Sequence, residues 1–256
     1  MKERVRYYRD FDTDFSVSKN QSFALPHDYV YVRRDKLFRL LSALSYGAAY
    51  VFAQVYCRLF LKMRIRGKKI PRTAGGAFIF ANHTQPVGDV FMPALASRAR
   101  IYTVVSPANY GIPVIGKWLK YLGALPVPKE KKRLRQMSLA VEERLRDGAN
   151  IVIYPEGHVW EYYNGVRPFG TTPLYYPVKY GKPLFVLTTI YKKTRFGKKP
   201  RLYLYVDGPV RSDENLTPRE ASEELRLAVR RIMESRCAEG DAEYIKYIKE
   251  EKNDKG

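Results

Sequence analysis

From Gly75 onward the chain alternates short apolar runs with helical stretches, and this alternation constrains the fold more than any other feature of the sequence. Helical patterns lie between the apolar runs, and the clearest one, KKRLRQMSLAVEERLRDG (131–148), ends at a glycine typical of a helix C-cap. Strands that alternate with helices predict an α/β fold with a central, mostly parallel sheet flanked by helices. The six predicted strands are AFIFA (77–81), IYTVV (101–105), ALPV (124–127), NIVIY (150–154), PLFVLTTIY (183–191) and RLYLYV (201–206).

The borders of these patterns divide the 256-residue chain into four parts. Residues 1–35 are polar and aromatic without a clear period, and we interpret them as an N-terminal arm. Residues 36–70 form a membrane-associating helical segment, residues 71–212 the α/β core, and residues 213–256 a C-terminal helix and tail. The last helix opens with TPRE (217–220), which combines a capping box with a proline in the first turn.

The segment LFRLLSALSYGAAYVFAQVYCRLFLKM (37–63) is the most apolar part of the chain. Leu40 to Cys57 carries no charge, which is close to the shortest length that spans a bilayer. Basic residues flank both ends, so we expect a helix that lies in the headgroup region of a membrane rather than a clean span. The alternative is an ordinary amphipathic helix that covers the core. A narrow polar stripe recurs along this helix: Arg39, Ser42, Tyr46, Tyr50, Gln54, Arg58 and Lys62.

The net charge of +20 is large for this length and is unevenly distributed. From Lys36 to Lys129, both included, the chain has 14 lysines and arginines but a single acidic residue, Asp89. Such a charge attracts nucleic acid, phosphate-bearing substrates or an anionic membrane surface. A nucleic-acid-binding protein is the less favoured alternative, because the basic residues form no motif of that class and the apolar helix fits a membrane better.

One candidate for chemistry follows the first predicted strand, in ANHTQPVGDV (81–90). His83 stands at the carboxyl end of that strand, where open α/β sheets carry their active sites. A neutral imidazole can take the proton from an attacking hydroxyl, and a carboxylate on its other nitrogen fixes the tautomer. Asp89 is the only carboxylate that this segment offers. The alternative is a histidine that serves the turn, with Asp89 as a cap of the next helix.

The second candidate is the turn after the predicted strand at 150–154, in NIVIYPEGHVW. Pro155 and Gly157 shape this turn, and Glu156 is presented at the end of the strand. Because two strand ends can meet at one edge of a sheet, we expect this turn to lie near His83. A tight turn of this kind can also aim backbone N–H groups at a phosphate.

Together these two stretches resemble motifs of the glycerolipid acyltransferases, a family that includes bacterial 1-acyl-glycerol-3-phosphate acyltransferases. Asn82 and His83 followed by Asp89 resemble the family's first motif. YPEG (154–157) resembles its third motif, Phe-Pro-Glu-Gly-Thr-Arg. The resemblance implies the α/β fold of that family, a membrane-binding segment and an acyltransferase activity.

Two further elements extend the resemblance over residues 37–206. GKWLKYLGALPVPK (116–129) lies along a glycine-rich family segment that ends in a basic residue, and Lys129 stands where the family often has arginine. GKPLFVLTTIY (181–191) is similar to an apolar strand that opens with proline. The apolar segment at 37–63 precedes the first motif, as a helical membrane-binding motif does in the family.

The sequence departs from the family pattern at two places. Five residues separate the histidine from the aspartate where the family has four, and Gly88 can absorb the extra residue as a local bulge. The third motif continues with His-Val-Trp (158–160) in place of Thr-Arg, so the arginine that helps to hold the acceptor's phosphate is missing. Arg167 or Lys129 can substitute for it.

The resemblance implies direct acyl transfer, with His83 and Asp89 as the catalytic residues. His83 would deprotonate an acceptor hydroxyl, which would attack the thioester of acyl-CoA or acyl-carrier protein. No metal or other cofactor is implied; a zinc site built from these histidines and carboxylates matches no standard ligand spacing. His158 either contacts the acceptor or serves as a spacer in the turn. The residues implied in substrate binding are Asn82, Lys129, Glu156, Gly157, His158 and Arg167.

The sequence therefore predicts a membrane-associated O-acyltransferase that converts 1-acyl-glycerol-3-phosphate to phosphatidic acid in phospholipid biosynthesis. Its expected place is the cytoplasmic face of the cell membrane, as a peripheral or monotopic protein. The expected partners are an anionic membrane surface, the lysophospholipid acceptor and the acyl donor, and not nucleic acid. The alternative is a non-catalytic lipid-binding relative, because altered spacing and a lost arginine would misplace the reacting groups.

Overall fold

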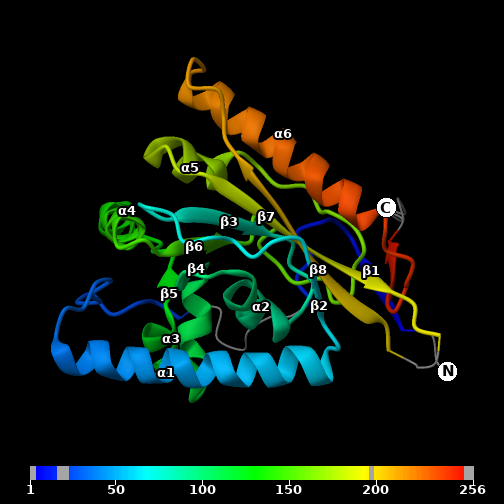
Figure 1. Cartoon of the computed structure of the whole chain (residues 1–256), viewed down its shortest axis with the longest axis horizontal. Helices are drawn as coiled ribbons and strands as arrows, with labels where there is room; N and C mark the ends of the chain where they lie inside the picture. Colours follow the sequence, from blue (N-terminus) through cyan, green and yellow to red (C-terminus); the bar gives the residue numbers. More distant parts are fainter. Residues whose placement is uncertain (1–3, 16–22, 196–198, 251–256) are drawn as a thin grey trace, which may run out of the picture.

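Figure 1 shows the computed structural model of the chain, which describes residues 4–15, 23–195 and 199–250. Its centre is a seven-stranded sheet in the order β2-β8-β7-β3-β6-β4-β5. β8 runs antiparallel to β7, and the other neighbouring pairs of this sheet are parallel. Helices cover both faces, so the predicted α/β fold with a mostly parallel sheet is confirmed.

All six predicted strands are present, with ends within four residues of the predicted ones, and Thr217 caps the last helix in the predicted capping box. The strands of the large sheet are β2 (Arg64–Arg66), β3 (Ala77–Ala81), β4 (Ile101–Val105), β5 (Ala124–Pro126), β6 (Asn150–Ile153), β7 (Leu184–Lys192) and β8 (Arg201–Val210). The α-helices are α1 (Lys36–Val55), α2 (Gly88–Ala96), α3 (Ile115–Leu122), α4 (Lys131–Arg146), α5 (Tyr175–Tyr180) and α6 (Pro218–Cys237). Shorter helical segments are η1 (Tyr56–Phe60), η2 (Pro107–Gly111) and η3 (Thr172–Leu174).

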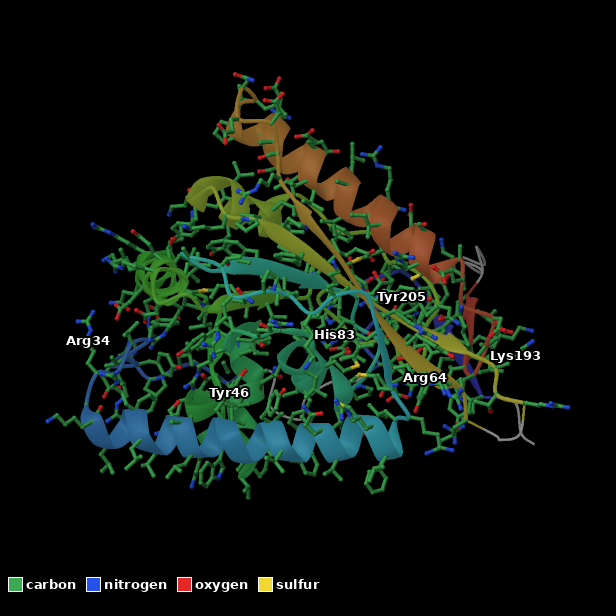
Figure 2. The ribbon with its side chains drawn as sticks, viewed as in Figure 1. Arg34, Tyr46, Arg64, His83, Lys193 and Tyr205 are labelled. Atoms are coloured by element: carbon green, nitrogen blue, oxygen red, sulfur yellow. The ribbon has the colours of Figure 1, made fainter. Side chains whose placement is uncertain are left out.

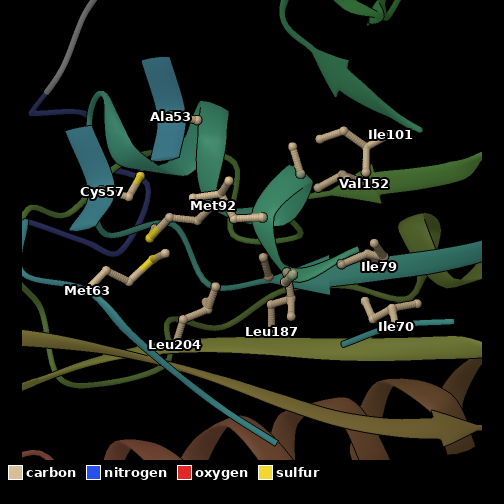
Figure 3. Close-up of a cluster of buried hydrophobic side chains, with 14 of the residues drawn as sticks. Ala53, Cys57, Met63, Ile70, Ile79, Met92, Ile101, Val152, Leu187 and Leu204 are labelled. Atoms are coloured by element: carbon tan, nitrogen blue, oxygen red, sulfur yellow. The ribbon is translucent and has the colours of Figure 1, made fainter. Parts of the chain in front are cut away.

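The middle strands lie between two layers of helices, and this position explains their sequences. All residues of β3 and β6 are buried, as expected for parallel strands covered on both faces, which form continuous apolar runs. One core lies on the side of α1 and α2, where Ile79, Val152 and Leu187 from the sheet gather with Met92 (Figure 3). The second core lies on the opposite face, where Phe78 clusters with residues of α4 and α6.

The apolar helix α1 lies along one side of the molecule (Figure 1). The middle of its polar stripe is turned inward, because Ser42 is buried and Tyr46, Tyr50 and Gln54 are half-buried. Ser42 is buried and donates a hydrogen bond to the Tyr121 carbonyl at 2.6 Å, and the Tyr46 hydroxyl accepts one from the Ile101 N–H at 3.2 Å. Lys36–Phe60 is long and apolar enough to cross a membrane. Only 17% of its most apolar 18-residue stretch is buried inside the protein, so most of this stretch is exposed. The exposed apolar side of α1 and η1 consists of Leu37, Leu40, Leu41, Leu44, Val51, Phe52, Val55, Leu59 and Phe60.

The N-terminal arm, whose role the sequence leaves open, pairs with the C-terminal tail. β1 (Val5–Tyr8) runs parallel to β9 (Lys246–Lys249) in a separate two-stranded sheet. The arm then continues past Trp160, whose indole N–H donates to the Thr13 carbonyl at 2.9 Å and whose ring stacks with Phe11. The arm therefore covers the loop that follows the YPEG turn.

Candidate active site

The His83 imidazole and the Asp89 carboxylate form a hydrogen-bonded pair, with 2.6 Å between Nδ1 and Oδ2. His83 follows the carboxyl end of β3, and Asp89 lies in the first turn of α2. The same carboxylate oxygen accepts a hydrogen bond from the Gln85 backbone N–H at 2.9 Å. The Asp89 side chain is 1% exposed and that of His83 is 21% exposed, so solvent reaches the imidazole but not the carboxylate.

The extra residue between the histidine and the aspartate is accommodated in the loop before α2. Tyr191 of β7 holds this loop: its hydroxyl donates to the Thr84 carbonyl and accepts from the Gln85 side-chain amide, each at 3.0 Å. The predicted bulge at Gly88 is wrong, because Gly88 begins α2 without a positive φ. A Cβ on Gly88 would lie 2.9 Å from Leu61 Cδ1, so this glycine permits close packing against the end of the apolar helix.

Tyr154 contacts both members of the pair. Its ring stacks on the His83 ring, with centroids 4.4 Å apart and planes inclined by 28°, and its hydroxyl donates to the Asp89 main-chain carbonyl at 2.5 Å. Burial raises the pKa of the Tyr154 phenol well above its ordinary value, and the Asp89 carboxylate raises it further, so the phenol stays a donor. No role for this residue follows from the sequence alone; its only signal is a tyrosine where the third family motif has phenylalanine.

Glu156 supports the backbone of the first motif rather than its imidazole. Its Oε2 accepts a hydrogen bond from the His83 backbone N–H at 3.4 Å and from the Arg167 guanidinium at 3.0 Å. Burial raises the pKa of the Glu156 carboxyl, while the Arg167 guanidinium and the His83 N–H oppose the rise. Gly157 completes the turn with φ at +78°, a backbone conformation that favours glycine. The two strand ends therefore meet at one sheet edge, as expected.

Arg167 brings a guanidinium to the third motif, but it is fully buried. Besides the Glu156 carboxylate, it donates to the carbonyls of His158 and Phe11, the latter at 3.3 Å. The guanidinium also lies over the Trp160 ring, 5.3 Å from its centroid. Binding a substrate phosphate would require Arg167 to leave these partners, so this geometry favours a structural role.

The other residues implied in substrate binding occupy three different places. Asn82 is buried, and its side-chain amide exchanges two hydrogen bonds with the Thr189 backbone of β7, at 2.9 and 2.7 Å. These bonds anchor the loop to the sheet and occupy both ends of the amide. The His158 Nδ1 lies 3.2 Å from the Asp14 carboxylate of the arm. Lys129 is exposed on the separate loop between β5 and α4.

The arrangement provides a base but gathers no cluster of metal ligands. Among residues 4–15, 23–195 and 199–250, no three His, Cys, Asp or Glu side chains group as a metal site. An imidazole that donates its Nδ1–H to a carboxylate presents an unprotonated Nε2. His83 can therefore accept a proton from a hydroxyl, and Asp89 can stabilise the imidazolium that forms.

Comparisons with known proteins agree with this geometry. Residues 62–181, which include both strand-end motifs, match the family model described as Acyltransferase. Among solved structures the chain is similar to the 1-acyl-sn-glycerophosphate (LPA) acyltransferase PlsC from Thermotoga maritima, with a TM-score of 0.56. The two share 19% sequence identity over 82% of this chain and 84% of that chain, which shows a common fold. No curated protein matches the chain.

Proposed function

Because residues 62–181 belong to the acyltransferase family, we propose that the chain moves a fatty acyl group from a thioester donor to the free hydroxyl of a lysophospholipid. The observation that carries this proposal is the 2.6 Å hydrogen bond between His83 and Asp89 beyond the carboxyl end of β3. Because the fold of the chain is similar to that of the Thermotoga enzyme, the acceptor that we propose is 1-acyl-glycerol-3-phosphate. The product is then phosphatidic acid. The donor is acyl-CoA or acyl-carrier protein.

In the proposed reaction the His83 Nε2 takes the proton of the acceptor hydroxyl. The alkoxide attacks the thioester carbonyl, and the tetrahedral intermediate collapses as its carbon–sulfur bond breaks. The departing thiolate takes this proton from the imidazolium and leaves as a thiol, so the histidine is neutral again. Because the Asp89 carboxylate is shielded from water, its interaction with the imidazolium is stronger than that of an exposed ion pair. We propose that Lys129, which is exposed, binds the phosphate of the acceptor.

We also propose that the exposed apolar side of α1 and η1 rests on the cytoplasmic face of an anionic membrane. A second element contributes to the same region, because α3 packs against α1 and exposes Ile115 and Trp118. Val87 and Val90, on either side of the buried Asp89, are exposed as well. An exposed apolar surface of this extent is typical of a membrane or partner contact, and the flanking basic residues fit anionic lipid.

Acyl transfer from labelled long-chain acyl-CoA to 1-acyl-glycerol-3-phosphate in detergent tests this proposal. His83→Ala should lower kcat by roughly 10²–10⁴-fold, the contribution typical of a general base. Asp89→Asn should cause a loss of similar size, because the amide no longer stabilises the imidazolium. His27→Ala is the matched control, since His27 is exposed on the segment before α1 and should leave kcat unchanged.

The proposal fails if the wild type is inactive with a panel of lysophospholipid acceptors and with both donors. Retained binding to lipid vesicles would then assign the chain to lipid binding without turnover. Turnover that survives His83→Ala would instead show that the pair at the end of β3 is not the base.

A further inference from the structure

Four basic side chains converge on Tyr203 at the edge of the large sheet. The Arg66 guanidinium carbon and the Lys192 Nζ lie 5.3 and 5.5 Å from the centroid of its ring. Arg64 of β2 is the register partner of Tyr203, and Arg201 lies two residues before Tyr203 on β8, so its side chain is on the same face of the sheet. Burial raises the pKa of the Tyr203 phenol, but these three guanidinium groups lower it by more. We call these five residues the Tyr203 cluster.

Little negative charge compensates the Tyr203 cluster. The Glu239 carboxylate lies 3.5 Å from the Lys192 Nζ, and it also accepts a hydrogen bond from the Tyr205 hydroxyl at 2.6 Å. Within the part of the chain that the structure describes, the three arginines of the cluster have no ion pair with a carboxylate. Like charges held this close repel one another, and a bound anion relieves that repulsion.

The Tyr203 cluster lies at the same edge of the sheet as His83. β7 is parallel to β3, and the antiparallel β8 places Arg201 opposite Lys192 at the carboxyl end of β7. β2 is parallel to β8, with Arg64 beside Tyr203. Figure 2 shows His83 and Arg64 toward this end of the sheet. β2 is three strand spacings away from β3, which is on the order of 14 Å.

The Tyr203 cluster faces away from the exposed apolar side of the molecule. Leu204 of β8 and Ile65 of β2 belong to the core on the side of α1 and α2. Since neighbouring residues of a strand point to opposite faces, Tyr203 and the two arginines beside Ile65 lie on the other face. A ligand on that face comes from the aqueous side, and not from a membrane in contact with α1.

We infer that the Tyr203 cluster binds the phosphate groups of a coenzyme A donor. This inference rests on the proposed function and names the donor for it. In acyl-CoA a flexible arm separates the thioester from the phosphates, so the phosphates bind away from His83. Four cations around one ring fit the closely spaced charges of a diphosphate and a ribose phosphate better than the scattered carboxylates of a carrier protein. The donor then extends along the sheet edge, with its phosphates at the Tyr203 cluster, its thioester at His83 and its acyl chain toward the exposed apolar side of α1.

The double variant Arg64→Gln/Arg66→Gln tests this inference, because both side chains are exposed and their removal leaves the core intact. At saturating acceptor in detergent, KM for acyl-CoA should rise about tenfold or more with little change in kcat, since each lost contact is a charge-assisted bond. The difference from the wild type should shrink at high salt. The matched control is Arg211→Gln/Arg219→Gln, which removes the same charge from exposed positions at the far end of β8 and the start of α6.

Calorimetric binding of unacylated CoA separates this inference from the proposed function, because it needs no turnover. Weaker CoA binding by the double variant supports the inference even if acyl transfer is not observed. An active enzyme whose KM and CoA affinity are unchanged in the double variant overturns the inference alone. Unchanged CoA affinity with weaker binding to anionic vesicles, or with a higher KM only for acyl-carrier protein, assigns the cluster to that ligand and also overturns the inference.

Discussion

At the scale of single residues, Tyr154 connects the His83–Asp89 pair to the end of β6. Tyr154→Phe keeps the ring that stacks on His83 and removes only the hydroxyl that donates to the Asp89 carbonyl. We expect kcat to fall roughly tenfold with KM unchanged, the effect of one lost hydrogen bond that positions a catalytic group. Tyr154→Leu also removes the stacking and should lower kcat further.

Steady-state kinetics with thermal unfolding as a companion measurement separates positioning from folding in these Tyr154 variants. If the hydroxyl only stabilises the fold, Tyr154→Phe lowers the unfolding temperature and leaves kcat unchanged. If the hydroxyl positions His83 and Asp89, kcat is lower even when it is measured at temperatures well below the unfolding temperature. Tyr154→Phe should then retain more activity than Tyr154→Leu.

The buried ion pair between Glu156 and Arg167 provides a second prediction at this scale. Arg167→Met leaves an uncompensated carboxylate in the core and should lower the free energy of unfolding by about 3–5 kcal/mol. Glu156→Gln combined with Arg167→Met should recover part of that loss, because no buried charge remains. Denaturant unfolding of the single and double variants measures both effects. An Arg167→Met protein of normal stability with a raised KM for the acceptor would instead make Arg167 a phosphate ligand.

At the scale of elements, the sequence predicts buried strands well and short edge strands poorly. β3 and β4 have the predicted bounds, since a buried apolar run between turns is recognisable without knowledge of its partner. β1, β2 and β9 have three or four residues each and mixed polarity, and each pairs with a strand far away in the chain. The same limit applies to the site. Motifs locate His83 and Glu156, but no motif shows that the loop after the YPEG turn folds back to pair Arg167 with Glu156, eleven residues away.

Helix α1 shows that a polar stripe does not reveal which side of a helix faces outward. The sequence predicts the stripe, and in the structure two of its members, Ser42 and Tyr46, form hydrogen bonds with the backbone of the α/β core. The apolar side is left exposed, contrary to the usual pattern of a soluble amphipathic helix. This orientation supports the proposed membrane contact. The helix also covers the core, as the alternative expected, but it does so with Ala53, Tyr46 and Tyr50 while its apolar side stays exposed.

Substitutions on α1 test this orientation. Leu40→Gln/Leu44→Gln/Val51→Gln should reduce binding to anionic lipid vesicles on the order of 100-fold, because each apolar side chain contributes about 1 kcal/mol or more when it leaves water. Stability in detergent should change little, since these three side chains are more than half exposed. Ser42→Ala is the reverse control: it should lower stability by about 1–2 kcal/mol and leave vesicle binding unchanged. Undiminished vesicle flotation of the triple variant would contradict the membrane contact through α1.

At the scale of the whole molecule, the sheet edge with His83 separates two surfaces of different chemistry. The exposed sides of α1 and α3 are apolar, and the opposite face of β2 and β8 carries the Tyr203 cluster. A substrate with an acyl tail and a phosphate-bearing carrier matches this division, with its thioester at the boundary.

The N-terminal arm supports the active site through Trp160. Tyr8, Phe11 and Phe15 surround Trp160, whose backbone N–H donates to the His83 carbonyl at 3.0 Å. Deletion of residues 1–15 removes these aromatic contacts, which together contribute about 3 kcal/mol at roughly 1 kcal/mol each. The unfolding temperature should therefore fall by roughly 6–12 °C, and kcat should fall because the loop beside His83 loses its support.

Tryptophan fluorescence reports directly on this deletion, because the chain has only two tryptophans. Trp160 is fully buried, whereas Trp118 is 51% exposed on α3. In a Trp118→Phe background the emission comes from Trp160 alone, and removal of residues 1–15 should shift it to longer wavelength as water reaches the indole. An emission maximum that does not move, together with unchanged kcat, would show that the loop after the YPEG turn holds its shape without the arm.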